Sequence, residues 1–540
     1  MRVVLIQPPI QDFYTTVQRL FPLGLCSLKA VLLKNDPDLE IQIIDCQQSG
    51  KKTITLPKEL SFLKNYYPES DHSPFAAFGP FYHFGYSYEE IINLIRIFKP
   101  DLIGIASLFT PYHREVLTLA KSCKEVFQIP IVVGGPHASA CPELMMEDGN
   151  IDFVICGEGE RPLVSLVREL KGNREFEKVP NLVFRFNDHV IKNPLEKNFP
   201  LQDLPFPDPS NFPIETYTLR GKPLAFILSS RGCPWSCSFC SVHQIFHEGY
   251  REREVEDIVT EMKELFKKGI RVFDFEDDNL TFNKSRLLSL CSRIKDEFSQ
   301  SEIELIAMNG VSYLALDLER LKAMWDAGFR ELNLSLVSSN EFVNKECQRP
   351  FSLEHFKKIV LEAYRLGFSI VSYQILGLPN ESLESMKNTL LVLAELPVLV
   401  GASPFYIPPQ SPISKRFSAP DKTDLIRARL SALGPYPGRR DEIYTLFILI
   451  RMIDFLKGLD FEGEQKKISE LISLNARERR GEIGFELMIK LFTEKKLYGK
   501  NKKGFFLKTK FQKETFQVVW NSLRIIKTQR GKTVICDLPL

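Results

Sequence analysis

Two series of short apolar segments, each alternating with amphipathic segments, most strongly limit the folds open to this chain of 540 residues. The apolar segments of the first series lie at residues 3–6, 41–44, 102–106, 131–133 and 153–155. Amphipathic segments such as 88–98 and 114–127 separate them. Short apolar runs that alternate with helical periods are typical of parallel strands covered by helices on both faces. The first series therefore predicts an α/β domain built on a doubly wound parallel sheet.

The second series begins after residues 180–217, which are rich in proline, asparagine and aspartate. Such a composition favours an extended linker over packed regular structure. Apolar segments then recur at residues 224–228, 272–275, 303–307, 331–336, 370–376 and 399–405, and helical segments such as 255–267, 318–327, 353–366 and 383–393 separate them. This repeated strand and helix pattern predicts a partial (β/α)6 barrel.

Strand signals largely end after Pro412, and residues 443–456 form a mostly apolar helical segment marked by Arg451 and Asp454. A mainly helical C-terminal region is therefore expected. At about 150 residues per domain, a chain of this length needs several cores. We expect an N-terminal domain at 1–175, a linker at 176–220, a barrel at 221–420 and the helical region at 421–540. The aromatic-rich residues 75–88 are expected to pack in a core or between domains.

The composition is that of a soluble globular protein, with 44% hydrophobic and 26% charged residues. A formal net charge of +2 gives no reason to expect a nucleic-acid partner, and the basic stretch at 477–532 is expected to be a solvated helical face. The N-terminal residues resemble a strand more than a secretion signal, and no apolar run reaches the roughly 18 residues that cross a bilayer. Eleven cysteines in such a chain indicate a reducing compartment. We expect a cytoplasmic protein without a transmembrane segment.

Cys233, Cys237 and Cys240 stand with three and then two residues between them, directly after the first strand of the second series. Loops at the carboxyl ends of barrel strands carry the active sites of β/α barrels, so this loop can bring the three thiols together. Three thiolates can hold an iron–sulfur cluster and leave its fourth iron open to a small molecule. The residues leave open a zinc site completed by His243 or His247, or three ordinary buried cysteines.

The motif resembles that of the radical S-adenosylmethionine (SAM) superfamily, with the usual aromatic residue, Phe239, before the last cysteine. The resemblance implies a [4Fe-4S] cluster on Cys233, Cys237 and Cys240, whose unique iron binds SAM. Reduction of the cluster, by a donor such as flavodoxin or ferredoxin, would cleave SAM to methionine and a 5′-deoxyadenosyl radical. The protein's own part would be binding, orientation and electrostatics.

Further residues match the family pattern at the carboxyl ends of later barrel strands. The resemblance implies that acidic groups there bind the amino group or ribose of SAM, and that Gly377 allows close approach of the adenine. Asp277, Asp278 and Glu381 serve equally well as N-caps of the helices that follow. Val337 stands where relatives often carry an acidic residue, so that Ser335, Ser338 or Gln374 is expected to replace its contact. The candidate SAM-binding residues are Phe239, Glu276, Asp277, Asp278, Ser335, Gln374, Gly377 and Glu381.

Glycine-rich and polar loops follow the strands of the first series, at the sheet edge where open α/β domains bind ligands. Their order is Pro8-Pro9, then Pro22-x-Gly24, Gly134-Gly135-x-His137 and Gly157-Glu158-Gly159-Glu160. This order resembles the cobalamin-binding domain that precedes the barrel in a large branch of the superfamily, and implies a Rossmann or flavodoxin-like cobalamin domain over residues 1–169. The candidate cobalamin-binding residues are Gln7, Pro8, Ser107, Thr110, Gly134, Gly135, His137, Gly157, Glu158 and Gly159.

The Asp-x-His-x-x-Gly motif that coordinates cobalt in many cobalamin proteins does not occur in the sequence. His137 follows the fourth strand of the first series, so we expect it to be a loop or tail-pocket residue and not a cobalt ligand. The nucleotide tail of cobalamin is expected beside Ser107, Gly134 and Gly135.

These resemblances imply a cobalamin-dependent radical SAM enzyme with a small-molecule or lipid-like substrate. Methyl transfer to an unactivated carbon is the leading hypothesis, and cobalamin-dependent cyclisation, ring contraction or rearrangement is the alternative within the family. A methylthiotransferase would need a second cysteine triad, whereas the N-terminal cysteines are scattered. A non-enzymatic cobalamin or redox sensor, with the helical region as its effector, is the alternative outside enzymes.

Overall fold

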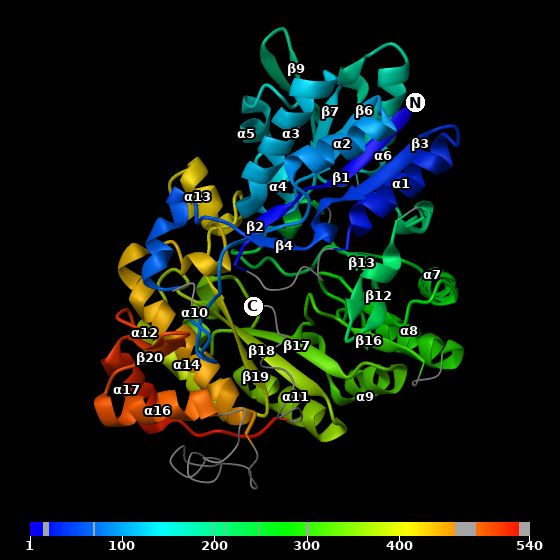
Figure 1. The fold of residues 1–540 in the computed structure, drawn as a ribbon. Helices are drawn as coiled ribbons and strands as arrows, with labels where there is room; N and C mark the ends of the chain where they lie inside the picture. The colour runs from blue at the N-terminus through cyan, green and yellow to red at the C-terminus, as the bar shows by residue number, and fades with distance from the viewer. Residues whose placement is uncertain are drawn as a thin grey trace.

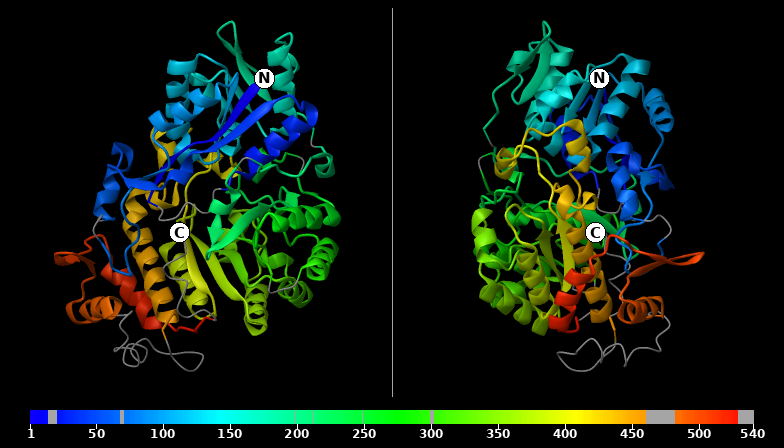
Figure 2. Two further views of the ribbon diagram at one scale, coloured as in Figure 1. Left: turned by 45° about the vertical axis from the view of Figure 1, so that its right-hand side comes forward. Right: turned by 90° about the vertical axis from the view of Figure 1, so that its left-hand side faces the viewer.

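The computed structural model describes residues 1–13, 21–67, 71–197, 199–210, 212–247, 249–298, 302–459 and 482–528. Figure 1 shows an N-terminal α/β domain, drawn blue to cyan, above a curved layer of green strands and helices, with yellow to red C-terminal elements beside them. In the further views of Figure 2, the yellow segment that carries α13 (Lys422–Arg427) reaches up against the N-terminal domain. The three parts therefore pack on one another.

The N-terminal domain is built on parallel strands in the spatial order β8-β7-β6-β1-β3. Alternate residues of β1 face two cores, because Val3 and Leu5 pack on one side of the sheet and Val4 and Ile6 on the other. Helices α1 (Leu23–Asn35) and α6 (Glu160–Lys171) cover the first side, and α2 (Tyr88–Phe98) and α3 (His113–Phe127) cover the second. The prediction of a doubly wound sheet is confirmed. The strands are β1 (Arg2–Gln7), β3 (Glu40–Asp45), β6 (Leu102–Ala106), β7 (Ile131–Gly134) and β8 (Phe153–Ile155).

An antiparallel hairpin, β9 (Leu182–Phe186) and β10 (His189–Lys192), extends this sheet beyond β8. The prediction of an extended segment without packed regular structure at 180–217 is wrong for these residues. The hairpin forms because the side chains of β9 next to β8 are buried and because Asn187 and Asp188 both adopt positive φ angles, 47° and 61°, as a type I′ turn requires. The boundaries between the four expected parts stay predictions.

Shorter elements complete the N-terminal domain. Helices α4 (Pro136–Ala140) and α5 (Pro142–Glu147) follow β7. A small antiparallel sheet in the order β2-β5-β4 joins the chain after β1 to the aromatic-rich stretch. Its strands are β2 (Ile10–Asp12), β4 (Lys51–Thr53) and β5 (Tyr82–Phe84).

The second part contains parallel strands at each of the predicted segments. They form two groups, β12-β15-β16 and β17-β18-β19, which isolated bridges from Leu305 to Phe329 and from Val311 to Leu334 join. The predicted partial barrel is confirmed. The strands are β12 (Lys222–Ile227), β15 (Val272–Phe275), β16 (Glu304–Ile306), β17 (Glu331–Val337), β18 (Ser369–Leu376) and β19 (Leu399–Pro404), with β11 (Thr218–Leu219) antiparallel to β12. The helices are α7 (Val255–Lys267), α8 (Lys284–Glu297), α9 (Leu318–Ala327), α10 (Glu341–Glu346), α11 (Leu353–Leu366) and α12 (Leu383–Ala394).

The C-terminal region is mainly helical in its described residues, as predicted. It consists of α13, α14 (Arg440–Lys457), α16 (Glu482–Glu494) and α17 (Lys513–Ser522). Sequence analysis gave no sign of the hairpin formed by β20 (Tyr498–Asn501) and β21 (Gly504–Leu507). The basic stretch at 477–532 falls on these elements and partly outside the described residues. Among the described residues, no helix is both long and apolar enough to cross a membrane.

Helix α14 is the apolar helix predicted at 443–456, and it is buried along most of its length. The aromatic stretch of the N-terminal domain packs on it: the ring of Phe78 stacks on Phe447 with 5.4 Å between centroids, and Phe75 meets Phe455 at 5.5 Å. The stretch thus packs between two parts of the chain, as expected. Lys457 is fully buried, and its Nζ donates to the carbonyls of Leu393 and Leu396 at 3.2 and 2.6 Å.

Replacement of Phe447 by alanine is expected to lower the free energy of unfolding by about 3 to 5 kcal/mol, because it leaves a cavity between α14 and the N-terminal domain. Urea unfolding followed by far-UV circular dichroism measures the loss. Phe342→Ala is the matched control, since Phe342 is 60% exposed, and it should change stability by less than about 0.5 kcal/mol. Equal losses in the two variants would contradict this packing.

Candidate functional site

The cysteine loop follows β12 at the carboxyl end of the barrel. A short antiparallel pair, β13 (Ser230–Arg231) and β14 (Arg251–Glu252), closes its base. Gly232 has a φ of +83°, and a Cβ there would lie 2.3 Å from the carbonyl oxygen of Gly249. Only glycine allows the two arms of the loop to approach this closely.

Two side chains from later loops donate to the sulfur atoms. Asn279 Nδ2 lies 3.6 Å from Cys233 Sγ, and Arg349 Nη1 lies 3.8 Å from Cys237 Sγ. Such donors favour the thiolate, the form that binds iron. Burial acts in the opposite direction and raises the pKa of Cys240 to about 11, which metal coordination would reverse. The donor set therefore fits an iron–sulfur cluster.

The three thiols lie near one another, since both Cys237 and Cys233 act to raise the pKa of Cys240. Among the described residues, no group of three or more His, Cys, Asp or Glu side chains stands ready to hold a metal ion. Neither histidine is placed as a fourth zinc ligand. His243 Nε2 lies 2.8 Å from the carbonyl of Trp235, and His247 lies against Gly157. The assignment of the cysteines as cluster ligands stays a prediction carried by their spacing.

The acidic residues after β15 hold the cysteine loop in place. Asp277 is buried and accepts hydrogen bonds from the backbone N–H of Ser229 at 3.2 Å and from the hydroxyls of Ser229 and Ser230. Asp278 Oδ2 accepts from the N–H of Gly232 at 3.0 Å, and burial raises the pKa of Asp278 to about 6. Glu276 is half-buried, and its N–H donates to Ile227 at 2.9 Å. Asp277 is thus committed to the loop, so its predicted contact with SAM is not supported.

The N-cap alternative is wrong for these acidic residues. Asn283 caps α8 and Ser382 caps α12. Glu381 instead accepts from the hydroxyls of Ser338 and Ser385 at 2.7 and 3.1 Å, and burial raises its pKa to about 7.

A cavity of about 380 Å³ opens at the carboxyl end of the barrel. Of the predicted SAM-binding residues, Phe239 and Ser335 line it. Tyr373 and Ile375 of β18 also line it, so the alternation of the strand places Gln374 on the opposite face. Gln374 is buried there and its amide has no hydrogen-bond partner. Sequence analysis missed Asn309 and Asn333 in the lining.

Two further residues of the family pattern, Gly377 and Val337, have distinctive surroundings. A Cβ on Gly377 would lie 2.8 Å from Cδ1 of Ile443 in α14, so this glycine makes room for a helix of the C-terminal region where adenine was expected. Val337 adopts a φ of +71°, and the register of β17 against β18 shifts between Ser335 and Val337. The departure from the family pattern therefore coincides with an irregularity of the strand.

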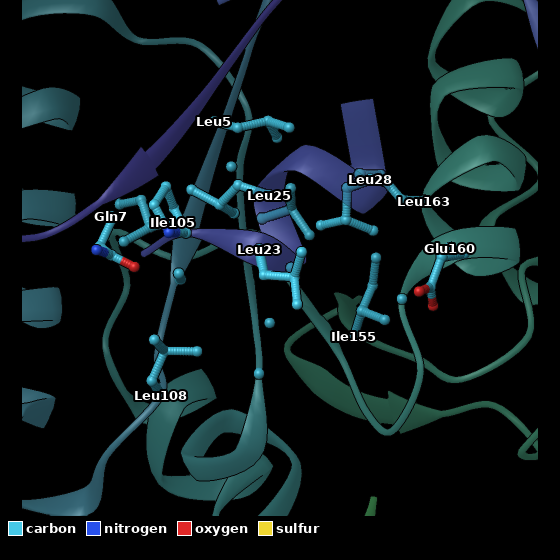
Figure 3. Close-up of a pocket in the computed structure, with 18 of the residues that line it drawn as sticks. Leu5, Gln7, Leu23, Leu25, Leu28, Ile105, Leu108, Ile155, Glu160 and Leu163 are labelled. Atoms are coloured by element: carbon cyan, nitrogen blue, oxygen red, sulfur yellow. The ribbon is translucent and has the colours of Figure 1, made fainter. Parts of the chain in front are cut away.

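A second cavity, of about 260 Å³, lies at the carboxyl ends of β1, β6, β7 and β8 and is shown in Figure 3. The predicted residues that line it are Gln7, Gly134, Gly135, Gly157 and Gly159. A Cβ on Gly135 would lie 2.8 Å from the carbonyl oxygen of Ser107, and the φ of Gly135 is +111°. Apolar residues of the neighbouring helices and strands, which sequence analysis did not assign, form much of the wall; Figure 3 labels Leu5, Leu23, Leu25, Leu28, Ile155 and Leu163 among them.

Other predicted residues lie behind this cavity. His137 is buried, its Nδ1 lies 3.2 Å from Thr110 Oγ1, and burial lowers its pKa to about 3. The backbone N–H of His137 donates to the carbonyl of Ser107 at 3.0 Å. His137 Nε2 and Ser107 Oγ are buried without a partner, which fits a polar ligand that enters from the cavity. The carbonyl of Pro8 accepts from Gln47 Nε2 at 3.0 Å.

Glu158 and Glu160 form ion pairs that connect the N-terminal cavity to the cysteine loop. Glu158 accepts from Arg231 Nη1 at 2.6 Å and from Arg251 Nη2 at 2.5 Å, and Glu160 accepts from Arg231 Nη2 at 2.6 Å. Burial acts to raise the pKa of Glu160, but Arg231 outweighs it and leaves that pKa below its usual value. The side chain of Glu158, predicted to bind cobalamin, is thus held by arginines of the cysteine loop. Sequence analysis could not pair residues so far apart.

Two family models match the chain. The model of the radical SAM superfamily matches residues 227–393, and that of the B12 binding domain matches residues 80–167. The first range contains the cysteine loop with the strands from β15 to β18, and the second contains the strands from β6 to β8 and the loop with Glu158.

The chain is also similar to curated relatives. The chain is 29% identical to an uncharacterised methyltransferase of Pyrococcus horikoshii over 322 residues, which are 58% of this chain and 68% of the relative. It is 26% identical to cytidylyl-2-hydroxyethylphosphonate methyltransferase of Streptomyces wedmorensis over 427 residues, 72% of this chain and 76% of the relative. It is 23% identical to an anaerobic magnesium-protoporphyrin IX monomethyl ester cyclase of Cereibacter sphaeroides over 312 residues, 56% and 50% of the two chains.

Solved structures share the fold. The radical SAM methyltransferase TsrM of Kitasatospora setae, with cobalamin and a [4Fe-4S] cluster bound, matches with a TM-score of 0.57 and 16% identity over 76% of each chain. The cobalamin-dependent radical enzyme OxsB, with aqua-cobalamin and SAM bound, matches with a TM-score of 0.55 and 17% identity, over 81% of this chain and 58% of that one.

Replacement of Arg231 by glutamine is expected to lower the free energy of unfolding by about 3 kcal/mol, because two buried carboxylates lose their shared cation. Thermal and urea unfolding measure the change. Arg220→Gln is the control, since Arg220 is 43% exposed in its pairs with Glu304 and Glu331, and its loss should cost less than about 1 kcal/mol. A similar cost for both variants would mean that the pairs between the domains contribute no more than surface pairs.

Proposed function

Because the chain belongs to the cobalamin-dependent radical SAM family, with a B12-binding domain joined to a radical SAM domain, we propose that it is a methyltransferase. Its reaction would place a methyl group on an unactivated carbon of a small-molecule substrate. The observation that carries the proposal is the set of ion pairs from Glu158 and Glu160 to Arg231, since it brings the glycine-lined cavity against the loop of Cys233.

The residues that would hold the cofactors are those with a fitting environment. Cys233, Cys237 and Cys240 would bind a [4Fe-4S] cluster, with Asn279 and Arg349 as donors to two of the sulfurs. Phe239 and Ser335 would contact SAM in the barrel cavity, and the cavity of Figure 3 would take the nucleotide tail of cobalamin. When bound, these groups supply radical generation and the methyl carrier, with electrons from a donor such as flavodoxin or ferredoxin.

The protein's own part is to bind, orient and exclude water. Apolar side chains line much of the cavity of Figure 3 and part of the barrel cavity. Such walls keep competing reactants away from an unstable carbon radical. Holding the substrate in one orientation beside the reacting group also turns a bimolecular reaction into an effectively unimolecular one.

Two named relatives support methyl transfer over ring closure. The methyltransferases of Pyrococcus horikoshii and Streptomyces wedmorensis match larger shares of their own length, 68% and 76%, than the 50% of the cyclase of Cereibacter sphaeroides. Cyclisation or rearrangement remains the alternative within the family, and a non-enzymatic sensor the alternative outside it.

Anaerobic reconstitution with iron, sulfide and hydroxocobalamin tests the two cofactor sites. The wild type is expected to show both corrin bands and cluster absorbance, and a Cys233→Ala, Cys237→Ala, Cys240→Ala variant only the corrin bands. If the wild type shows cluster absorbance but no corrin bands, the methyltransferase proposal is wrong.

Product analysis then distinguishes the reactions. Under strong reduction with SAM, a methyltransferase should form S-adenosylhomocysteine as well as 5′-deoxyadenosine, and the cysteine variant should form no 5′-deoxyadenosine. Formation of 5′-deoxyadenosine alone would favour the cyclase alternative, and failure to turn over SAM would favour a sensor.

Gly24→Trp tests the N-terminal cavity. Gly24 lines this cavity, and no atom lies within 4 Å of the position of its Cβ, so that a side chain can be added there without a clash at its first carbon. We expect the dissociation constant for hydroxocobalamin to rise at least about tenfold, or 1.4 kcal/mol, as measured by equilibrium dialysis. Gly149→Trp, which is equally unobstructed but lies outside the cavity, is the control. Unchanged affinity in Gly24→Trp would show that cobalamin binds elsewhere.

A further inference from the structure

A third cavity, of about 670 Å³, lies between the N-terminal domain and residues 406–440. Cys141 and Leu144, at α4 and α5, form one side of it. Tyr406 lines this cavity and the barrel cavity alike, so that the two spaces share a wall. Burial raises the pKa of Tyr406, and the nearby Cys240 adds to the shift. The third cavity thus begins next to the cysteine loop.

Two arginines of the C-terminal region line this cavity, Arg427 at the end of α13 and Arg440 at the start of α14. Both guanidinium groups lie over the ring of Phe62, at 5.4 and 3.9 Å from its centroid. A shared aromatic neighbour holds the two cations close together. Burial and the neighbouring Arg427 lower the pKa of Arg440.

Neither arginine has an acidic partner in the described part of the chain. No carboxylate there lies within ion-pair distance, 4.0 Å, of either guanidinium. Arg427 Nε donates to the carbonyl of Glu59 at 3.0 Å, and Arg440 Nε is buried without a hydrogen-bond partner. The acidic residues that line the cavity are engaged elsewhere: Glu143 pairs with Lys192 at 3.3 Å, and Asp424 accepts from the N–H of Asp421 at 3.3 Å.

Two adjacent, partly desolvated cations without counter-ions cost free energy unless an anion binds between them. Guanidinium groups match the oxygens of phosphate and phosphonate in geometry, and a pair of them matches a dianion in charge. We propose that this cavity binds a phosphate or phosphonate group of the substrate through Arg427 and Arg440. The inference rests on the proposed function, because it assigns the anion to the molecule that reacts in the barrel cavity on the other side of Tyr406.

Inorganic phosphate is the probe, titrated into the reconstituted full-length protein in a calorimeter. The wild type should bind it saturably, and Arg427→Gln and Arg440→Gln should each raise the dissociation constant at least tenfold. Arg439→Gln is the matched control, since Arg439 pairs with Glu442 at 3.2 Å and does not line the cavity; it should stay within twofold. Absence of saturable binding, or equal binding by the Arg427→Gln, Arg440→Gln double variant, overturns the proposal.

A measurement on the wild type guards against misfolded variants. Phosphate should protect Arg427 and Arg440 from phenylglyoxal, as read by peptide mass spectrometry, whereas acetate at equal ionic strength should not. Equal protection by acetate would mean a site for a monoanionic carboxylate and would overturn the dianion assignment.

Reductive cleavage of SAM by the wild type is followed in parallel. Cleavage of SAM without binding of phosphate would contradict only the proposed anion site. Binding of phosphate without cleavage of SAM would contradict the proposed function and, with it, the assignment of the anion to a radical substrate.

Discussion

The buried ion pairs around Arg231 govern how the two α/β parts meet. Removing one partner of a buried ion pair leaves an uncompensated charge, so the loop after β8 and the cysteine loop each depend on the other being in place. Glu158 and Glu160 alternate with Gly157 and Gly159, which line the N-terminal cavity, and Arg231 stands two residues before Cys233. The pairs therefore tie the N-terminal cavity to the cysteine loop.

The C-terminal region completes this arrangement from the other side. A partial barrel ends in an edge strand, and an exposed edge pairs readily with other chains. Here α14 covers β19, and Asp454 accepts the N–H of Val400 at 2.9 Å. Arg429 reaches the N-terminal domain, where it donates to the carbonyl of Gln11 in β2 at 3.0 Å and to that of Pro111 in the turn after β6 at 2.9 Å. The same segment thus closes the barrel and ties it to the first domain.

Strand positions and the cysteine motif could be predicted because period and spacing are local properties of the sequence. The hairpin at 182–192 was missed because the surrounding prolines outweighed the Asn187-Asp188 turn signal. The partners of Asp277 and Glu158 could not be predicted, because a carboxylate looks the same in a sequence whether it faces a ligand, a hydroxyl or a distant arginine. Leu25 and Leu28 were overlooked because apolar residues on a helix resemble core.

The polar residues at the strand ends share one physical feature. Polar residues at the strand ends were expected to touch the ligands, yet most of those with a clear partner hold loops, as Asp278 holds Gly232 and Glu381 holds Ser338. The walls of the N-terminal cavity are largely apolar in their place. Apolar walls exclude water from a cavity, and polar groups behind the wall fix its shape. In such a site the charges that remain unpaired on a cavity surface, as at Arg427 and Arg440, are the ones that point to the substrate.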